Sequence, residues 1–522
     1  MKAQLRTSRE IFFNLLLAYS VFSGALRIRA ADWPQYRGSN HDGISTEVIR
    51  TNWAAEAPRQ NWKVPMDPGL SSFSVSGGRI FTMVRRPVSG QQDQEFCVAM
   101  SADTGQESWA SAPLGLADYP DGGVGTDDGP RSTPSIDGDR VYVLTSYLRL
   151  YCLNATNGAT VWSRDLVTEY GSSVIAWQSA ASPLIDGELI FVHGAVANKS
   201  LLAFHKTDGT EAWKGQSDVM TQASPVAATI AGVRQIVFFA QSGLVSVAPD
   251  TGSVLWRYPF TFSVSTAASP VVGDDTVYCS ATYGMGAGAV HITSSGNQLA
   301  TNQVWRTPGA NMNHWATPVF QNGHIYGVYG ESSTTLRCVE MATGTEKWRQ
   351  GGVGLGEVLF VSGHVLVLTD NGYLLLVKPD PAAYTEVARF RALDGSQSSF
   401  PGLVRCWNVP AISDGRIYVR STTEAVCLDV SVPQPVQPLK LDGALSGGSG
   451  GFQLRIGNAD GSPLDTNRIA NIDVFATADL TLGLNSWLKL TNPVVLANGQ
   501  LRLDDPQSAT TPQRFFRVEE RP

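Results

Sequence analysis

Several aromatic, amide and cationic side chains stand just before a short unit that recurs along the chain, in which a small residue and a proline open an apolar stretch. These candidate site residues are Arg131, Trp177, Gln178, Asn311, Asn313, His314, Trp315, Trp407 and Asn408. Such a set can stack on a ligand and exchange hydrogen bonds with it, which suits a polar ligand or a peptide. The structural alternative is that the tryptophans cap a channel and His314 bonds only to backbone.

Recognisable catalytic signatures are missing from the sequence. It contains no H-E-x-x-H, P-loop, nucleophile-elbow or C-x-x-C-H haem motif. An acidic loop at residues 117–130 offers the oxygen ligands that a hard cation prefers, from Asp118, Asp121, Asp127 and Asp128. Their spacing matches no EF-hand, so we interpret the loop as solvated and predict no metal site. Enzymatic activity stays open, and the sequence favours its absence.

The elements that must position the candidate residues follow from a repeat. A small residue is followed ten positions later by a tryptophan, with a glycine at the sixth step, in five segments: Ala99–Trp109, Cys152–Trp162, Ala203–Trp213, Ser246–Trp256 and Cys338–Trp348. A strand, a tight turn whose glycine takes a positive φ, and a return strand explain this spacing. We expect the five tryptophans to dock onto neighbouring repeats.

Together with the proline-containing unit, this hairpin gives four short antiparallel strands per repeat, which is the size of a propeller blade. Two weaker copies, one ending at Trp305 and one beginning at Glu357, bring the count to eight blades. The last copy ends at Val430 without its own final strand, and residues 61–65 can supply it. The sequence therefore predicts an all-β, eight-bladed propeller of four-stranded antiparallel blades, closed by its two ends.

The cysteines fit this repeat as small side chains. Cys152, Cys338 and Cys427 take the position that alanine or serine fills in other copies. Equivalent positions of adjacent blades are too far apart for a disulfide. Free, buried thiols are therefore expected.

The composition changes towards both ends of the chain. Residues 1–30 read as a signal peptide, because a basic start precedes an apolar stretch, Ile11–Leu26, that is short for the roughly 20 residues of a membrane span; an uncleaved anchor is the alternative. The propeller is assigned to residues 31–432, a Pro/Gly/Ser linker to 433–450 and a small β-sandwich-like module to 451–522. No cysteine precedes Cys97, so lipid attachment is not expected, and the location predicted is periplasmic or extracellular.

Two stretches indicate a family. CVEMATGTEKW (338–348) and SVAPDTGSVLW (246–256) match the tryptophan-docking motif of PQQ-like β-propellers, and DWPQYRGSNHDGIS (32–45) is typical of an exported bacterial branch. The chain resembles these repeat proteins, which include BamB-like outer-membrane assembly factors. PQQ (pyrroloquinoline quinone) dehydrogenases of similar fold hold the quinone over a tryptophan, beneath a disulfide between adjacent cysteines, with a metal ligated by Glu, Asn and Asp. This chain has no adjacent cysteines.

The resemblance therefore implies a non-catalytic binding or protein-assembly scaffold, with no cofactor, whose partner is a protein or a small polar ligand. The alternative is a quinoprotein-like oxidoreductase that uses PQQ with Ca²⁺ at the channel mouth. A net charge of −7 argues against nucleic acid as a partner. No membrane span is expected after signal removal, and the oligomeric state is open.

Overall fold

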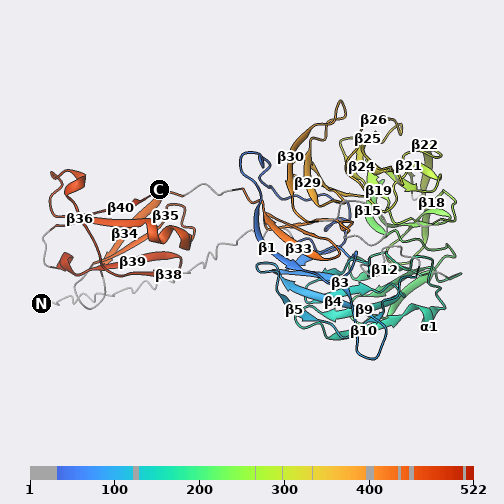
Figure 1. Ribbon diagram of the computed structural model, residues 1–522, viewed down its shortest axis with the longest axis horizontal. Coiled ribbons are helices and arrows are strands. Elements are labelled where there is room, and N and C mark those ends of the chain that lie inside the picture. The colour runs from blue at the N-terminus through green and yellow to red at the C-terminus, as the bar shows by residue number, and fades with distance from the viewer. Residues whose placement is uncertain are drawn as a thin grey trace, which may run out of the picture. The chain divides into compact units, whose positions relative to one another are not determined.

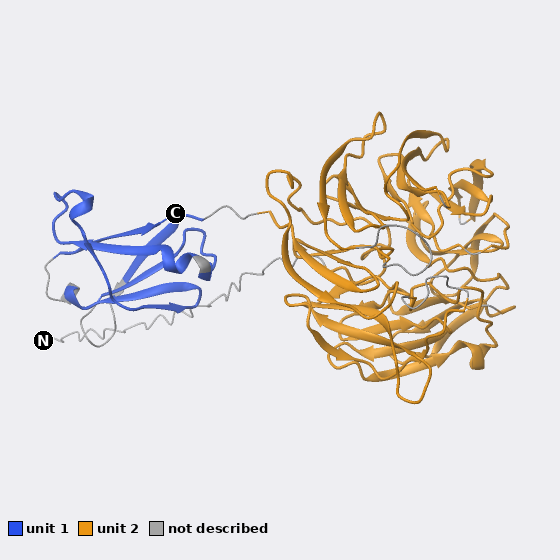
Figure 2. Ribbon diagram, viewed as in Figure 1, with its two compact units in different colours: residues 1–29, 433–522 blue, residues 30–432 orange. Residues whose placement is uncertain are grey.

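The computed structural model describes most of the chain, and the predicted signal peptide lies outside the described part. The described residues are 32–120, 128–194, 196–264, 266–296, 298–331, 333–394, 405–432, 437–445, 452–509 and 513–521. The chain divides into two compact units (Figure 2), residues 30–432 and a second unit whose described part runs from residue 437 to residue 521. None of the helices in the described ranges is long and apolar enough to cross a membrane.

Eight antiparallel sheets, here called blades 1 to 8, build the first unit (Figure 1). Blade 1 contains β2 (Ser74–Ser76), β3 (Arg79–Arg86), β4 (Gln94–Ser101) and β5 (Glu107–Ala110), with β6 (Gly115–Leu116) beside β4. Blade 2 contains β7 (Ser135–Asp137), β8 (Arg140–Leu144), β9 (Arg149–Asn154) and β10 (Thr160–Asp165), which leads into the short helix α1 (Leu166–Tyr170). Blade 3 contains β11 (Leu184–Asp186), β12 (Leu189–His193), β13 (Leu201–His205) and β14 (Glu211–Gly215). Blade 4 contains β15 (Val226–Ile230), β16 (Val233–Ala240), β17 (Gly243–Val247) and β18 (Val254–Pro259).

The other four blades repeat this plan. Blade 5 contains β19 (Val271–Gly273), β20 (Thr276–Ala281), β21 (Gly286–Ser295) and β22 (Gln298–Thr307). Blade 6 contains β23 (Val319–Gln321), β24 (His324–Tyr329), β25 (Thr335–Glu340) and β26 (Glu346–Gln350). Blade 7 contains β27 (Glu357–Val361), β28 (His364–Leu368), β29 (Tyr373–Val377) and β30 (Glu386–Arg391). Blade 8 contains β31 (Ala411–Ser413), β32 (Arg416–Arg420), β33 (Glu424–Asp429) and β1 (Arg59–Pro65). The predicted eight-bladed propeller is confirmed.

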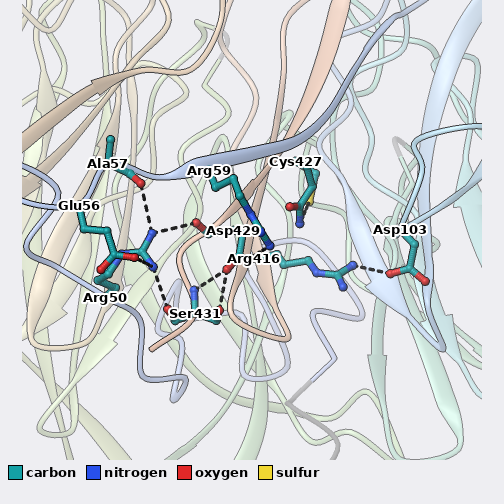
Figure 3. A network of polar contacts seen from close by, with 10 residues as sticks. Arg50, Glu56, Ala57, Arg59, Asp103, Arg416, Cys427, Asp429 and Ser431 are labelled. Atoms are coloured by element: carbon teal, nitrogen blue, oxygen red, sulfur yellow. Dashed lines mark hydrogen bonds and ion pairs between the residues drawn. The ribbon is translucent and has the colours of Figure 1, made fainter. Parts of the chain in front are cut away.

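The ring closes where β1 pairs with β33, as the sequence predicted. Polar side chains surround this seam (Figure 3). Arg50 donates to the backbone carbonyls of Ala57 and Ser431, and Arg59 pairs with Asp429 (2.7 Å). The seam thus joins residues that are about 370 positions apart in sequence, because Arg59 lies opposite Asp429.

Tryptophans on the outer strands lie against the turn of the next blade. Trp109 faces Ala99 across β4 and β5 and donates from Nε1 to the Ala155 carbonyl of blade 2 (3.1 Å). A Cβ on Gly158 would lie 2.5 Å from the Trp109 ring, so this turn position, at φ +73°, excludes a side chain. The tryptophan and glycine pairs of this kind are Trp62 with Gly105, Trp109 with Gly158, Trp162 with Gly209, Trp213 with Gly252, and Trp305 with Gly344.

Two tryptophans of the predicted docking set lie differently. Trp348 donates to the Asp380 carbonyl of blade 7 (2.7 Å) and packs edge-on against Tyr384, since the turn of that blade carries no glycine. Trp256 donates to Gln235 of its own blade instead of to the next one. Its neighbour, blade 5, has a longer hairpin between β21 and β22 in place of the Thr-Gly turn.

All six cysteines are buried and have free thiols. Cys152, Cys338 and Cys427 lie directly opposite Trp162, Trp348 and Trp62 across their strands. A small side chain is needed there because the ring of each tryptophan also packs, about 6 Å between centroids, on a tyrosine of the second strand: Tyr142, Tyr326 and Tyr418.

An N-terminal segment, residues 32–45, runs along the first strands of the blades. These strands are hydrogen-bonded within their sheets on one side only, and those of most neighbouring blades contact one another around the axis. Trp33 pairs with Val75 of blade 1, and Ile44 pairs with Phe360 of blade 7. The buried Arg37 donates to the carbonyls of Thr317 (2.8 Å), Pro318 (2.8 Å), Val358 (3.3 Å) and Asp42 (3.1 Å).

The second unit consists of two sheets that share one core. The first sheet has the order β34 (Leu439–Leu445), β35 (Phe452–Asn458), β39 (Gln500–Asp505), β38 (Val494–Ala497). The second has the order β37 (Leu488–Lys489), β36 (Ile472–Thr477), β40 (Phe515–Glu520). The 3-10 turns η2 (Thr466–Asn471) and η4 (Pro506–Ala509) lie between strands of different sheets, and η3 (Leu484–Ser486) lies between β36 and β37 of the second sheet. Leu454 and Leu503 of the first sheet and Val474 of the second belong to the same buried cluster, as in a β-sandwich.

The start of this sandwich differs from the sequence-based boundary. Residues 439–445 fall within the predicted linker but form β34 of the first sheet. The alternation of Leu439 and Leu441 accounts for the strand, since both pack against the shared core. The glycine- and serine-rich composition dominated the sequence interpretation of this region.

Candidate functional site

The loops that enter the first strands carry the predicted site residues. Arg131 precedes β7, Trp177 and Gln178 precede β11, residues 311–315 precede β23, and residues 407–408 precede β31. Each loop joins the outer strand of one blade to the first strand of the next. The nine side chains do not form one cluster, and they fall into three groups with different contacts.

An aromatic ladder is the first group, and it links the loops before β23 and β31. The ring centroids of His314 and Trp315 lie 4.4 Å apart, and those of Trp315 and Trp407 lie 4.6 Å apart. Tyr283, in the turn between β20 and β21, packs edge-on against His314, and the Arg405 guanidinium lies 5.0 Å from the Trp407 ring. Residues far apart in sequence thus present a continuous row of flat rings beside a cation.

Polar atoms of this ladder lack partners. His314 Nε2 lies 3.2 Å from the Tyr283 hydroxyl, while its buried Nδ1 has no hydrogen-bond partner in the described part of the chain. The same holds for the buried Trp407 Nε1. Burial lowers the pKa of His314 to about 4, so the ring is neutral near pH 7 and offers one donor and one acceptor. Buried polar atoms of this kind are normally paired, so these two nitrogens are exceptions.

Amide side chains form the second group, and they hold the loops in place. Asn313 is fully buried, accepts from the Tyr278 hydroxyl (2.6 Å) and donates to the Val328 carbonyl (2.7 Å). Asn311 donates to the Gly344 carbonyl (2.9 Å), and Asn408 donates to the Ser71 carbonyl (2.7 Å). These three residues therefore position the ladder.

Arg131, Trp177 and Gln178 make up the third group, and no contact joins them to the ladder among the described residues. Arg131 donates from Nη2 to both carboxylate oxygens of Asp128 (2.9 and 3.0 Å) and lies 5.2 Å from the Tyr119 ring. Gln178 is buried and its backbone carbonyl accepts from Gln222, whereas 41% of Trp177 is exposed. Trp177 is thus the accessible member of this group.

A buried acid lies close to Arg131. Glu95 accepts from the Tyr119 hydroxyl (2.5 Å) and from the Ser146 amide (3.1 Å), and burial raises its pKa. Asp128 of the acidic loop is occupied by Arg131, while Asp121 and Asp127 lie outside the described residues. Within the described ranges, no three potential metal-binding side chains come together.

Comparison with known proteins gives the family. The model of the outer membrane protein assembly factor BamB family matches residues 93–350. The quinohemoprotein alcohol dehydrogenase from Comamonas testosteroni is similar in structure, with a TM-score of 0.55, 11% identity, and coverage of 80% of this chain and 83% of that one. Over residues 93–350 the chain thus resembles the PQQ-like β-propellers. No curated protein matches this PQQ-like propeller in sequence.

Two further solved structures are similar to the PQQ-like propeller. The quinohemoprotein alcohol dehydrogenase ADHIIG from Pseudomonas putida HK5 has a TM-score of 0.52 and 12% identity, and the match covers 80% of this chain and 84% of that one. BamB from Moraxella catarrhalis has a TM-score of 0.49 and 13% identity, with coverage of 72% and 99%. At 11% and 12% identity, the structural likeness of the two alcohol dehydrogenases establishes the fold alone.

The mouth of this PQQ-like propeller does not fit a PQQ and metal site as the resemblance describes it. Asn313 Oδ1, the atom that would ligate a metal, already accepts from the Tyr278 hydroxyl (2.6 Å). No two cysteines are adjacent, and all six are buried within the blades and the loop before β31. The ladder alone offers a tryptophan surface on which a planar ring could rest.

Two members of the ladder were missed by the sequence interpretation. Tyr283 and Arg405 lie outside the proline-containing units, and Tyr283 belongs to a different loop from the other members of the ladder. Tyr283 takes a positive φ of 55° in a turn, and 48% of it is exposed. A large aromatic residue in an exposed turn was the available signal.

Proposed function

We propose that this PQQ-like propeller is a non-catalytic scaffold that binds an extended segment of a partner protein at the channel mouth. The main observation behind this proposal is the ladder of His314, Trp315 and Trp407, which has two unpaired, buried nitrogens. Aromatic residues and arginine supply most of the binding energy at protein interfaces. Peptide carbonyls can accept from Trp407 Nε1, while neighbouring side chains stack on the rings.

The matched family supports a role in assembly, because its description names an outer membrane protein assembly factor. An assembly role agrees with the expected periplasmic or extracellular location.

N-terminal sequencing of the protein from the culture medium and from the periplasm would determine both the location and the cleavage site. Recovery of a full-length chain that starts at Met1 would contradict export with cleavage.

Substitution of the ladder tests the scaffold. Peptides of about 12 residues, selected from a random library on the immobilised full chain, should bind at least tenfold more weakly to Trp407→Ala, a loss of about 1.4 kcal/mol. The loss follows from the stacking and the indole donor that the substitution removes. Val254→Ala, at an exposed position of β18, serves as the matched control. Fluorescence polarisation with the labelled peptide measures both.

Equal affinity of the wild type and Trp407→Ala for every selected peptide would place the binding elsewhere.

The quinoprotein alternative is favoured by the tryptophan surface, and titration with PQQ plus Ca²⁺ tests it directly. Saturable quinone absorbance that disappears in His314→Ala would replace the scaffold with the oxidoreductase.

Peptide affinity should also be independent of pH between about 6 and 8. Because burial lowers the pKa of His314 to about 4, the ring stays neutral over this range. Protonation at lower pH would place a charge against Trp315 and alter the unpaired Nδ1. A binding curve measured at each pH shows the dependence, and a transition centred near pH 6.5 would mean that His314 is exposed to water in the bound complex.

A further inference from the structure

A cavity of about 250 Å³ lies between the N-terminal segment and the first strands of blades 4, 5 and 6. Arg37, His41 and Asp42 line it from the segment, and β15, β19 and β23 line it from the blades. Thr229 and Arg234, both exposed, border it as well, so the cavity is open to solvent. This site is separate from the aromatic ladder and from the function proposed for it.

In four other blades the N-terminal segment supplies an oxygen acceptor to the first strand. The pairs are Val75 N–H to the Trp33 carbonyl (2.8 Å), Ile136 N–H to the Pro34 carbonyl (2.8 Å), Ile185 N–H to Gln35 Oε1 (3.2 Å), and Phe360 N–H to the Gly43 carbonyl (2.8 Å). In each first strand, the donor is the residue immediately before the pair of residues that closes the hairpin turn. Their amides point away from the second strand and into the channel.

Ala227, Val272 and Phe320 face the cavity, and the last two hold the same register position in β19 and β23. In β15 the alternation of the ladder gives Ala227 the same orientation. The alternation of the ladder points their amides away from the second strand, and no carbonyl of a turn or loop accepts from them among the described residues. Amides at the wall of this cavity pair with water or with a bound acceptor, and the N-terminal segment provides no acceptor here.

His41 adds unpaired groups to the same cavity. Only 7% of it is exposed, and neither ring nitrogen has a partner in the described part of the chain. Burial lowers the pKa of His41 to about 3, so the neutral ring brings one donor and one acceptor. Arg37 Nε is likewise buried without a partner. The cavity therefore holds more donors than acceptors.

The unpaired Nε of Arg37 also favours an acceptor ligand. The charges themselves balance, because Arg37 and Arg234 stand against Asp42 and Asp186. One oxygen of Asp42 already accepts from the Ile44 amide (2.9 Å), and Arg234 also pairs with Asp186. A small anion would be stabilised by the buried guanidinium of Arg37.

We propose that the cavity binds a small organic carboxylate. Its oxygens accept from the amides of Ala227, Val272 and Phe320, as the carbonyls of the N-terminal segment do in other blades. A carboxylate presents about four lone-pair sites on two oxygens, which matches several converging donors. The cavity is smaller than the roughly 300–1,000 Å³ of sites for drug-sized ligands, so the ligand has few carbon atoms.

Amide chemical shifts test the proposal on the full-length propeller chain without its signal peptide. With isotope labels on alanine, valine and phenylalanine, titration with acetate, succinate or malate should shift the signals of Ala227, Val272 and Phe320 together. At least one of these probes should saturate with a Kd below roughly 1 mM. Inorganic phosphate, titrated separately, should leave the three signals unchanged. This measurement needs no substitution and so does not depend on a variant that folds.

A matched pair of substitutions tests the imidazole. His41→Asn, chosen because asparagine tolerates the positive φ of 60°, should raise the Kd of the saturating carboxylate at least tenfold. His205→Asn, at an exposed position of β13, should leave it unchanged. No saturable shift with any carboxylate up to roughly 10 mM, binding of phosphate alone, or equal affinity in His41→Asn would each overturn the proposal.

Discussion

Replacing Trp213 by alanine should lower the free energy of unfolding of the propeller by about 3–5 kcal/mol. The side chain is 7% exposed, packs on Phe191 in its own blade and donates from Nε1 to the Pro249 carbonyl of blade 4 (2.6 Å). The substitution removes this packing and leaves a cavity between two blades. It also leaves the Pro249 carbonyl without its donor. Urea unfolding followed by tryptophan fluorescence and circular dichroism measures the loss.

Two further variants show that the loss comes from docking. Gly252→Ala should also destabilise the propeller, because the new Cβ would lie 2.5 Å from the Trp213 ring and the backbone φ is +68°. Val161→Ala, on an exposed face of β10, should change stability by less than about 0.5 kcal/mol. If Gly252→Ala were as stable as the wild type, Trp213 would not rest on this turn in solution.

The second large effect concerns a buried acid at the start of blade 7. Burial raises the pKa of Glu357 to about 8, and Arg37 nearby offsets part of this rise. Between pH 4.5, the ordinary value, and about 8, the folded chain therefore holds a proton that the unfolded chain releases. The contribution of this bound proton to the free energy of unfolding is fully present below pH 4.5 and is lost as the pH rises towards 8.

Glu357→Gln should remove that dependence. Since each pKa unit corresponds to about 1.4 kcal/mol, the upper limit of the effect is about 5 kcal/mol. From pH 5 to pH 9 the wild type should lose stability relative to Glu357→Gln, so that the variant is the more stable protein at pH 9. Urea midpoints at each pH give the comparison, with Glu56→Gln as the control at an exposed carboxylate. Parallel curves for wild type and Glu357→Gln would show that Glu357 is ionised in the folded protein.

The repeat could be predicted from the sequence because its causes are local. Ala99 and Trp109 face each other across one tight hairpin, so their spacing is constant wherever the turn is the same. The ten-residue spacing does not determine which residue accepts the hydrogen bond from the tryptophan indole. Trp256 follows the pattern and still bonds within its own blade, because blade 5 has a different hairpin.

The candidate sites depend on contacts that are remote in sequence. Loop positions of Trp315 and Trp407 followed from the proline-containing units, but their stacking joins blades 6 and 8 and has no signature in either loop. Arg37 belongs to a recognisable motif, yet its partners Thr317 and Val358 lie 280 and 321 positions away. The cavity beside Arg37 exists because, among the described residues, the N-terminal segment bonds to the first strands of blades 1, 2, 3 and 7 but not to those of blades 4, 5 and 6.

Closure of the ring by β1 and β33 has a consequence for the order of folding. β1 leaves the ribosome early, and its hydrogen-bonding partner arrives only after seven other blades. Until then β1 keeps an unpaired edge, which invites pairing with other chains. Long-range closure of this kind is slow. The unfinished propeller must therefore remain protected from aggregation until the chain is complete, and a chaperone that shields strand edges would raise its yield more than one that shields apolar surface alone.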